Sequence, residues 1–139
     1  MQDAVLGFAF DPSSGKVALI KKIKPAWQCG RINGVGGKVE PSETPAQAIV
    51  REFREETSLQ IDGDKWEHVF TFFENGWGVW VYRARVDLSH IRSPEEEKVE
   101  LYDPTDLPVS VMSNLRWIVP LLAFEEVQHP FAIWTGRPK

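Results

Sequence analysis

The chain has 139 residues, 42% of them hydrophobic, and its 16 lysines and arginines against 20 aspartates and glutamates give a formal net charge of −4 at pH 7. This length predicts a single globular domain over residues 1–139, with a buried core and one functional site. The acidic balance argues against a nucleic acid polymer as partner, because such binding depends on many lysines and arginines that neutralise phosphates.

Cysteine content and hydropathy indicate the cellular compartment in which the protein is expected. Cys29 is the only cysteine, which excludes an intrachain disulfide and a zinc site built from several thiolates. No basic segment precedes the apolar run near the N-terminus, as it would in a signal peptide. No stretch approaches the roughly 18 apolar residues of a membrane span. We therefore predict a cytoplasmic protein without a membrane partner, for which a monomer and a homodimer both remain open.

The first half of the chain predicts a hairpin, a loop region and a helix. Apolar residues over 5–10 and 17–20 flank a turn cluster, which predicts two paired strands. Residues 21–37 mix charge, proline and glycine without the periodicity of a helix or strand, which predicts a loop with short extended pieces. The glycines of this loop could let the backbone approach phosphates. Thr44 suits an N-cap and Pro45 the first helical position, so a helix is predicted from about 45 to about 58.

The second half predicts a hairpin, an acidic loop and a second helix. Aromatic and β-branched residues over 66–73 and 77–86 predict two antiparallel strands. Three glutamates at 95–97 predict a polar loop before a short strand. Helical periodicity over 112–127 predicts a helix in which Pro120 makes a kink or lies in an early turn. A last short strand over 131–134 completes an α+β domain. Trp27, Trp77 and Trp80 are candidates for stacking, but most of the six tryptophans are expected in the core.

The predicted first helix places three carboxylates on one face. At about 100° per residue, Glu52, Glu55 and Glu56 fall within one arc, beside an apolar arc that packs on the core. That apolar arc consists of Ala46, Ile49, Val50 and Phe53. Clustered like charges favour a bound hard cation such as Mg²⁺, which joins carboxylates to phosphates. Taken alone, however, this stretch is more typical of a solvated helix face.

The flanking residues change this interpretation, because residues 37–59 resemble the Nudix box. The matching positions are Gly37, Glu43, Arg51, Glu52, Phe53, Glu55, Glu56 and Leu59. So many matches at fixed spacing argue against chance agreement. Ser58 stands where the family has glycine, and we expect it to end the helix in a left-handed conformation at a cost on the order of 1 kcal/mol.

The resemblance implies a fold and a metal site. The fold is the Nudix α/β/α sandwich, with a mixed β-sheet between helices. The three helix glutamates are implied to hold Mg²⁺, or Mn²⁺, together with the Gly37 carbonyl. In the acidic loop, Glu96 is the preferred additional metal ligand.

The resemblance also assigns roles in catalysis. Arg51 is implied to orient the metal-holding glutamates, and Glu43 to brace the loop and helix through Arg51. The proton of the attacking water is taken by Glu52 or by a carboxylate of the acidic loop. The implied reaction is hydrolysis of a phosphoanhydride bond, assisted by the metal.

The entry to the box points to a substrate class. Residues 30–39 resemble the same region of MutT-type oxidised purine nucleoside triphosphatases, in which an asparagine at the Asn33 position touches the purine. Residues opening the second helix complete the base pocket, which implies a role for Asn114, although it equally suits a helix cap. Lys22 and Lys38 are candidates for the phosphate tail.

These features predict a pyrophosphohydrolase that converts a nucleoside triphosphate, such as 8-oxo-dGTP, to a nucleoside monophosphate and pyrophosphate. Two alternatives remain open at this stage. One keeps the chemistry but acts on nucleotide sugars, ADP-ribose or dinucleoside polyphosphates. The other is a nucleotide-binding module without turnover, against which the intact set of clustered glutamates argues.

Overall fold

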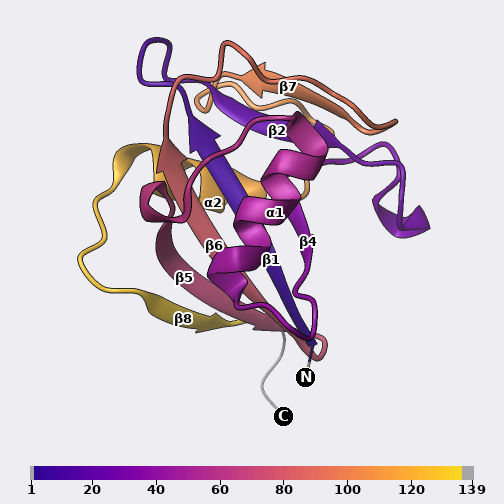
Figure 1. The fold of residues 1–139 in the computed structure, drawn as a ribbon, viewed down its shortest axis with the longest axis vertical. Coiled ribbons are helices and arrows are strands. Elements are labelled where there is room, and N and C mark those ends of the chain that lie inside the picture. Colours follow the sequence, from indigo (N-terminus) through magenta and orange to yellow (C-terminus); the bar gives the residue numbers. More distant parts are fainter. Residues whose placement is uncertain (1, 136–139) are drawn as a thin grey trace.

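A long first strand organises the fold of the computed structural model, which describes residues 2–135. This strand, β1 (Gln2–Phe10), pairs in parallel along its whole length with β6 (Trp77–Arg85). Its other edge pairs antiparallel with β4 (Val35–Lys38) and then, at Phe10, with β2 (Val17–Lys21). Both edges of β1 are therefore occupied, and the strand lies inside the sheet (Figure 1).

The remaining strands extend this sheet on both sides. The main order is β3-β2-β1-β6-β5-β8, with β7 also paired to β2. The added strands are β3 (Ile32–Asn33), β5 (Glu67–Glu74), β7 (Lys98–Tyr102) and β8 (Phe131–Trp134). β5 runs antiparallel to β6 but parallel to β8, so the eight-stranded sheet is mixed as predicted.

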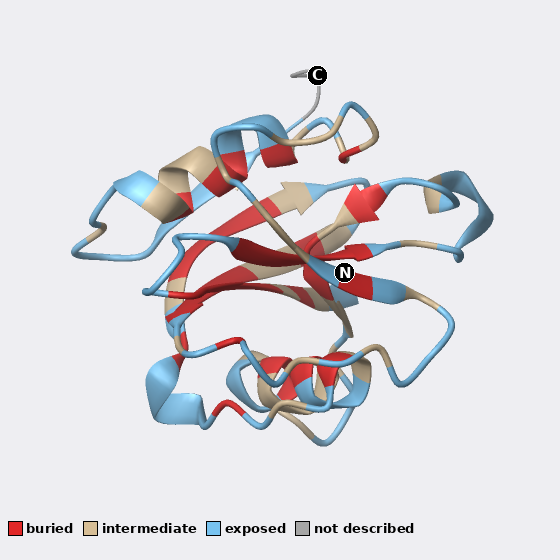
Figure 2. Ribbon diagram, turned by 90° about the horizontal axis from the view of Figure 1, so that it is seen from above, coloured by how far each residue is buried: buried red, intermediate tan, exposed pale blue. Residues whose placement is uncertain are grey.

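Two helices cover opposite faces of the sheet. α1 (Pro45–Thr57) lies on one face and α2 (Leu115–Phe124) on the other, each with its buried residues directed to the sheet (Figure 2). Side chains alternate along β1, so Val5 and Ala9 join the core beneath α1, while Phe8 and Phe10 join the core beneath α2. This confirms the predicted α/β/α arrangement. No helix within residues 2–135 is long and apolar enough to cross a membrane.

A buried arginine fixes the far end of α2 to the sheet. Arg83 on β6 is 1% exposed, and its Nη1 donates to the backbone carbonyls of Leu122 at 2.9 Å and Glu125 at 2.8 Å. Its Nη2 also donates to Glu67 at 2.8 Å. These bonds use carbonyls that a helix C-terminus otherwise leaves without partners, so Arg83 compensates its own burial while it anchors α2.

The glycine-rich stretch, predicted as a loop with short extended pieces, forms the short strands β3 and β4. A Cβ at Gly36 would clash with the backbone carbonyl of Val5, and one at Gly34 would lie 2.6 Å from the ring of Phe8. The glycines therefore allow β4 to pack closely on β1. Close packing on β1 therefore accounts for Gly34 and Gly36, and the approach of their backbone to phosphates stays a prediction.

Other sequence predictions need smaller corrections. Helix α1 has the predicted Thr44 cap, whose side chain accepts from the Gln47 amide at 3.2 Å. Its buried face holds Ala48 and Thr57 beside Ile49 and Phe53, whereas Ala46 is exposed. α2 is shorter than the predicted 112–127 and contains Pro120 within it. The expectation for tryptophan was also wrong: three lie on the surface and one is buried. The exposed ones are Trp27, Trp117 and Trp134, and the buried one is Trp66.

Ser58 ends α1 with a φ of 64°, in the left-handed region, and its amide donates to the Arg54 carbonyl at 2.9 Å. We expect Ser58→Gly to raise the free energy of unfolding by about 1 kcal/mol, since glycine adopts this conformation without a Cβ penalty. Turnover should be unchanged. Chemical denaturation and steady-state kinetics test this together, and a large change in activity would contradict it.

Candidate active site

Helix α1, which carries the glutamates of the box and is called the box helix below, lies against β4 at Gly37, where the strand has no side chain. A Cβ on Gly37 would lie 2.5 Å from Oε1 of Glu52. Any other residue at position 37 would therefore displace this carboxylate. The glycine that opens the box and its first helix glutamate are in direct contact, although 15 residues separate them in sequence.

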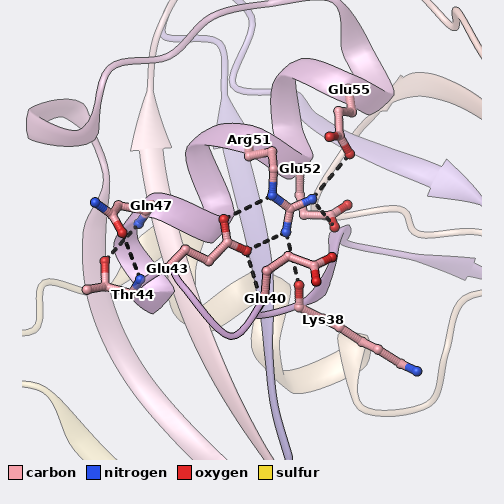
Figure 3. Close-up of polar contacts among 8 residues, drawn as sticks. All are labelled: Lys38, Glu40, Glu43, Thr44, Gln47, Arg51, Glu52 and Glu55. Atoms are coloured by element: carbon pink, nitrogen blue, oxygen red, sulfur yellow. Dashed lines mark hydrogen bonds and ion pairs between the residues drawn. The ribbon is translucent and has the colours of Figure 1, made fainter.

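Arg51 connects the box residues through a network of hydrogen bonds (Figure 3). Its guanidinium contacts both carboxylate oxygens of Glu43, with a distance of 3.0 Å from Nε to Oε2. Nη1 donates to Glu52 at 2.9 Å and to Glu55 at 3.3 Å, and Nη2 donates to the Lys38 carbonyl at 3.1 Å. The hydrogen bond from Arg51 holds the pKa of Glu43 below its usual range. One arginine thus orients two helix carboxylates and ties them to β4.

The third helix carboxylate is in a different environment. Oε2 of Glu56 is buried and has no hydrogen-bond partner among the described residues. Burial raises the pKa of Glu56 to about 8, although the positive charge of Lys22 opposes this shift. Burial likewise raises the pKa of Glu52. An ionised carboxylate without a partner is costly in such a place, so the protonated form of Glu56 is favoured.

The carboxylates are not already arranged around a cation. Within residues 2–135, no group of three histidine, cysteine, aspartate or glutamate side chains has a geometry that could hold a metal. Glu52 and Glu55 are engaged with Arg51, whereas Glu56 is not. Binding of a cation to all three would therefore require small rearrangements of these side chains.

A cavity of about 520 Å³ contains all the predicted ligand-binding residues. It is lined by Lys22, Asn33, Gly37, Lys38 and Asn114 among others. Lys22 directly follows β2, Asn33 belongs to β3, Gly37 and Lys38 belong to β4, and Asn114 precedes α2. The fold thus brings together residues from widely separated parts of the sequence beside the carboxylate-bearing helix.

The two asparagines of the cavity differ in how they are held. Asn33 is fixed, because its Nδ2 donates to Gln28 at 3.2 Å and its Oδ1 accepts from the Gly34 amide at 2.8 Å. Oδ1 of Asn114 is buried and has no hydrogen-bond partner within residues 2–135. Its side chain makes no capping hydrogen bond to α2. The structure therefore does not support the alternative that Asn114 caps the helix.

Other residues line the cavity besides the predicted polar ones. Trp27 and Gln28 come from the loop after β2, and Glu74 and Trp77 flank the turn of the β5–β6 hairpin. Lys38 Nζ lies 5.8 Å from the centroid of a Trp77 ring, which places a cation against an aromatic wall. Trp27 and Trp77 were candidates for stacking from the sequence. Gln28 and Glu74 were not predicted, because the pairing of distant strands decides which residues meet.

The acidic loop contacts the site through a different glutamate from the one predicted. Glu97 Oε1 accepts from Lys22 Nζ at 2.9 Å. The negative charges of Glu97 and Glu95 both favour the protonated form of Glu56. Glu96 is exposed and makes no side-chain hydrogen bond among the described residues. A role of Glu96 as metal ligand remains a prediction that the geometry does not favour.

Comparison with known proteins gives a consistent family. A family model described as NUDIX domain matches residues 1–122. The solved structure of a MutT protein from Bacillus halodurans superimposes with a TM-score of 0.73 at 21% sequence identity, covering 96% of this chain and 90% of that one. This likeness shows the fold.

Two curated proteins are similar over parts of their length. The uncharacterized Nudix hydrolase YvcI of Bacillus subtilis is 29% identical over 100 residues, which are 66% of this chain and 61% of that protein. The CTP pyrophosphohydrolase of Escherichia coli is 44% identical over 46 residues, 33% of this chain and 34% of that protein. The chain therefore spans less than two thirds of each curated relative that it matches.

Proposed function

The chain belongs to the NUDIX domain family, and from this premise we propose that residues 1–139 form one catalytic domain that hydrolyses a nucleoside triphosphate to a nucleoside monophosphate and pyrophosphate. The observation that carries the proposal is the cavity that joins phosphate-binding and base-binding groups beside the box helix. Lys22 and Lys38 offer cations for a polyphosphate, and Asn33 and Asn114 offer polar edges for a base.

The residues of the site fit a divalent cation. The side chains that Glu52, Glu55 and Glu56 offer are carboxylates, the class of ligand that Mg²⁺ and Mn²⁺ prefer. In the part of the chain that the structure describes, the buried Oε2 of Glu56 has no hydrogen-bond partner. We assign Glu52, Glu55 and Glu56 as its ligands, with the carbonyl of Gly37. When bound, such a cation stabilises charge on the phosphate oxygens and lowers the pKa of water.

The side chains of the chain supply the remaining chemistry. Arg51 keeps Glu52 and Glu55 in place without competing as a ligand, because its guanidinium stays charged. Glu52 or a carboxylate of the acidic loop accepts the proton of the attacking water. Lys22 and Lys38 offset the charge of the phosphate chain and orient it along the cavity.

The base is selected by hydrogen bonds that the protein cannot satisfy by itself. The buried Oδ1 of Asn114 requires a donor from the ligand, and a purine amino or ring N–H group provides one. The similarity to a CTP pyrophosphohydrolase supports a nucleoside triphosphate as the substrate class, and cytosine also carries an amino donor. We favour an oxidised purine such as 8-oxo-dGTP, because Asn33 and Asn114 present two polar edges to one pocket.

A substrate panel with Mg²⁺ tests this function. It contains 8-oxo-dGTP, dGTP, dATP, dCTP and CTP, together with a nucleotide sugar, ADP-ribose and a dinucleoside polyphosphate. Identification of both products locates the bond that is cut. We expect a nucleoside monophosphate and pyrophosphate from a triphosphate. Preferred cleavage of a nucleotide sugar would replace the proposed substrate class, and binding without turnover of any compound would contradict a hydrolase.

We expect Asn33→Ala and Asn114→Ala to reduce kcat/KM selectively for the preferred purine triphosphate. Each loss should correspond to about 1–3 kcal/mol, because donors or acceptors on the base lose their partners. Phosphate contacts remain, so a pyrimidine triphosphate should lose less and serves as the internal control. Equal losses on all triphosphates would assign the asparagines a structural role and remove the purine pocket.

A further inference from the structure

The loop after β2 forms one wall of the cavity but has little packing of its own. Residues 22–31 project away from the sheet (Figure 1) and contribute Lys22, Trp27 and Gln28 to the cavity lining. The short 3₁₀ turn Ala26–Gln28 contains no buried residue, and Trp27 is 70% exposed. This wall of the cavity therefore depends on polar contacts for its position.

The base of this loop is closed by its own backbone. The Lys22 amide donates to the Arg31 carbonyl at 2.7 Å, and the Gly30 amide donates to the Lys22 carbonyl at 2.8 Å. Neither bond reaches Ile23 or Lys24, which start the outward course of the loop. Their backbone amides are held instead by a side chain from another part of the chain.

That side chain is Glu97, which reaches the loop because β7 pairs with β2. The register places Lys98 opposite Lys21, so the residue before β7 lies beside the residue after β2. Glu97 Oε2 accepts from the amides of Ile23 at 2.7 Å and Lys24 at 3.2 Å, while Oε1 accepts from Lys22 Nζ at 2.9 Å.

Both oxygens of Glu97 are therefore committed to the loop. The side chain is 11% exposed, and hydrogen bonds from these three donors lower its pKa although burial alone would raise it. Its neighbours Glu95 and Glu96 are exposed. A cation at Glu97 would have to compete with charge-assisted hydrogen bonds that already satisfy the carboxylate.

We propose that Glu97 is a positioning residue that fixes the Lys22–Arg31 loop as the wall of the cavity, and so sets the affinity for the nucleotide rather than holding the metal. The inference rests on the proposed function for its kinetic consequence. The hydrogen bonds to Ile23 and Lys24 set the path of the loop, and the bond to Lys22 keeps that ammonium at the cavity.

The test compares Glu97→Gln with Glu100→Gln. Glutamine keeps one acceptor oxygen, but its amide nitrogen cannot accept the bonds made by the second carboxylate oxygen. We expect Glu97→Gln to raise KM for the preferred triphosphate about tenfold, with kcat within about twofold of wild type and an unchanged half-saturating Mg²⁺ concentration. Glu100→Gln removes an exposed carboxylate charge from the adjacent strand β7 without touching residues 22–24, and KM should stay at the wild-type value.

Hydrogen exchange provides a readout that needs no turnover. In Glu97→Gln, amides of the peptide spanning residues 22–31 should exchange faster than in wild type, while those of α1 keep their protection. Unchanged exchange in this peptide would overturn the proposal. A fall in kcat of about 100-fold with a higher Mg²⁺ requirement would also overturn it, because that is the signature of a lost metal ligand. A wild-type protein that cleaves no triphosphate would refute the proposed function, and the exchange measurement would still decide whether Glu97 anchors the loop.

Discussion

Glu55→Gln and Glu56→Gln are each expected to lower kcat by on the order of 10²-fold or more, because each removes one carboxylate charge from the proposed metal site. The two variants should differ in stability. Glu55 is largely exposed and accepts one bond from Arg51, so its replacement should leave the melting temperature almost unchanged. Glu56 is penalised by burial when ionised, so glutamine should stabilise the metal-free protein at alkaline pH.

Steady-state kinetics with saturating Mg²⁺ and melting curves with a chelator measure these effects. Glu100→Gln is a suitable control, since Glu100 is an exposed carboxylate on β7 outside the cavity. Turnover close to wild type in both helix variants would remove the catalytic assignment. Loss of activity together with a collapse in melting temperature would instead assign these residues a structural role.

The apparent Mg²⁺ affinity of the wild-type protein is expected to rise steeply with pH. The pKa of Glu56 is about 8 in the metal-free protein, compared with a usual value of 4.5, so Glu56 is protonated at neutral pH. A cation that binds the carboxylate must displace this proton. Between about pH 5 and 8, affinity should therefore increase by up to about tenfold for each pH unit.

The stability of the metal-free protein should change in the opposite direction. A carboxyl group with a raised pKa in the folded state stabilises the fold fully below its unfolded pKa, and this contribution is lost as the pH rises through the folded value. In the presence of a chelator, the protein should thus lose stability between about pH 4.5, the usual pKa of a glutamate, and about pH 8, the pKa of Glu56 in the folded state. Calorimetric titration with Mg²⁺ and melting curves over this range measure both trends. The Glu56→Gln variant should show a much flatter pH dependence, and an equally steep one would assign the proton to another group.

Local patterns in the sequence predicted the box helix accurately. The N-cap of Thr44, the proline that follows it and the helical spacing of the apolar residues all act within one or two turns of the chain, so no tertiary information was needed. The left-handed end at Ser58 was predictable for the same reason. The fold class followed from the number and type of such local elements together with the box.

Residues whose placement depends on distant strands were harder to predict. The glycines of β4 indicated a loop, because the backbone of β1 that they accommodate lies about 30 residues earlier in the chain. Glu97 reaches Lys22 across a separation of 75 residues, through the pairing of β2 with β7. Glu96 was preferred as a metal ligand by counting back from Leu101 in the strand that follows the acidic loop. Such a count contains no information about the neighbouring strand, which decides where each glutamate lies.

The position of β1 also constrains the order in which this chain folds during synthesis. β1 leaves the ribosome well before β6, which is the strand that completes one of its edges, with Gln2 paired to Trp77. Until β6 has emerged, an apolar strand carries an open edge that is able to pair with other chains. The nascent protein therefore passes through a long interval of exposure before its central sheet can close. A variant that slows docking of β6 should reduce the yield of native protein even where the stability of the finished fold is unchanged.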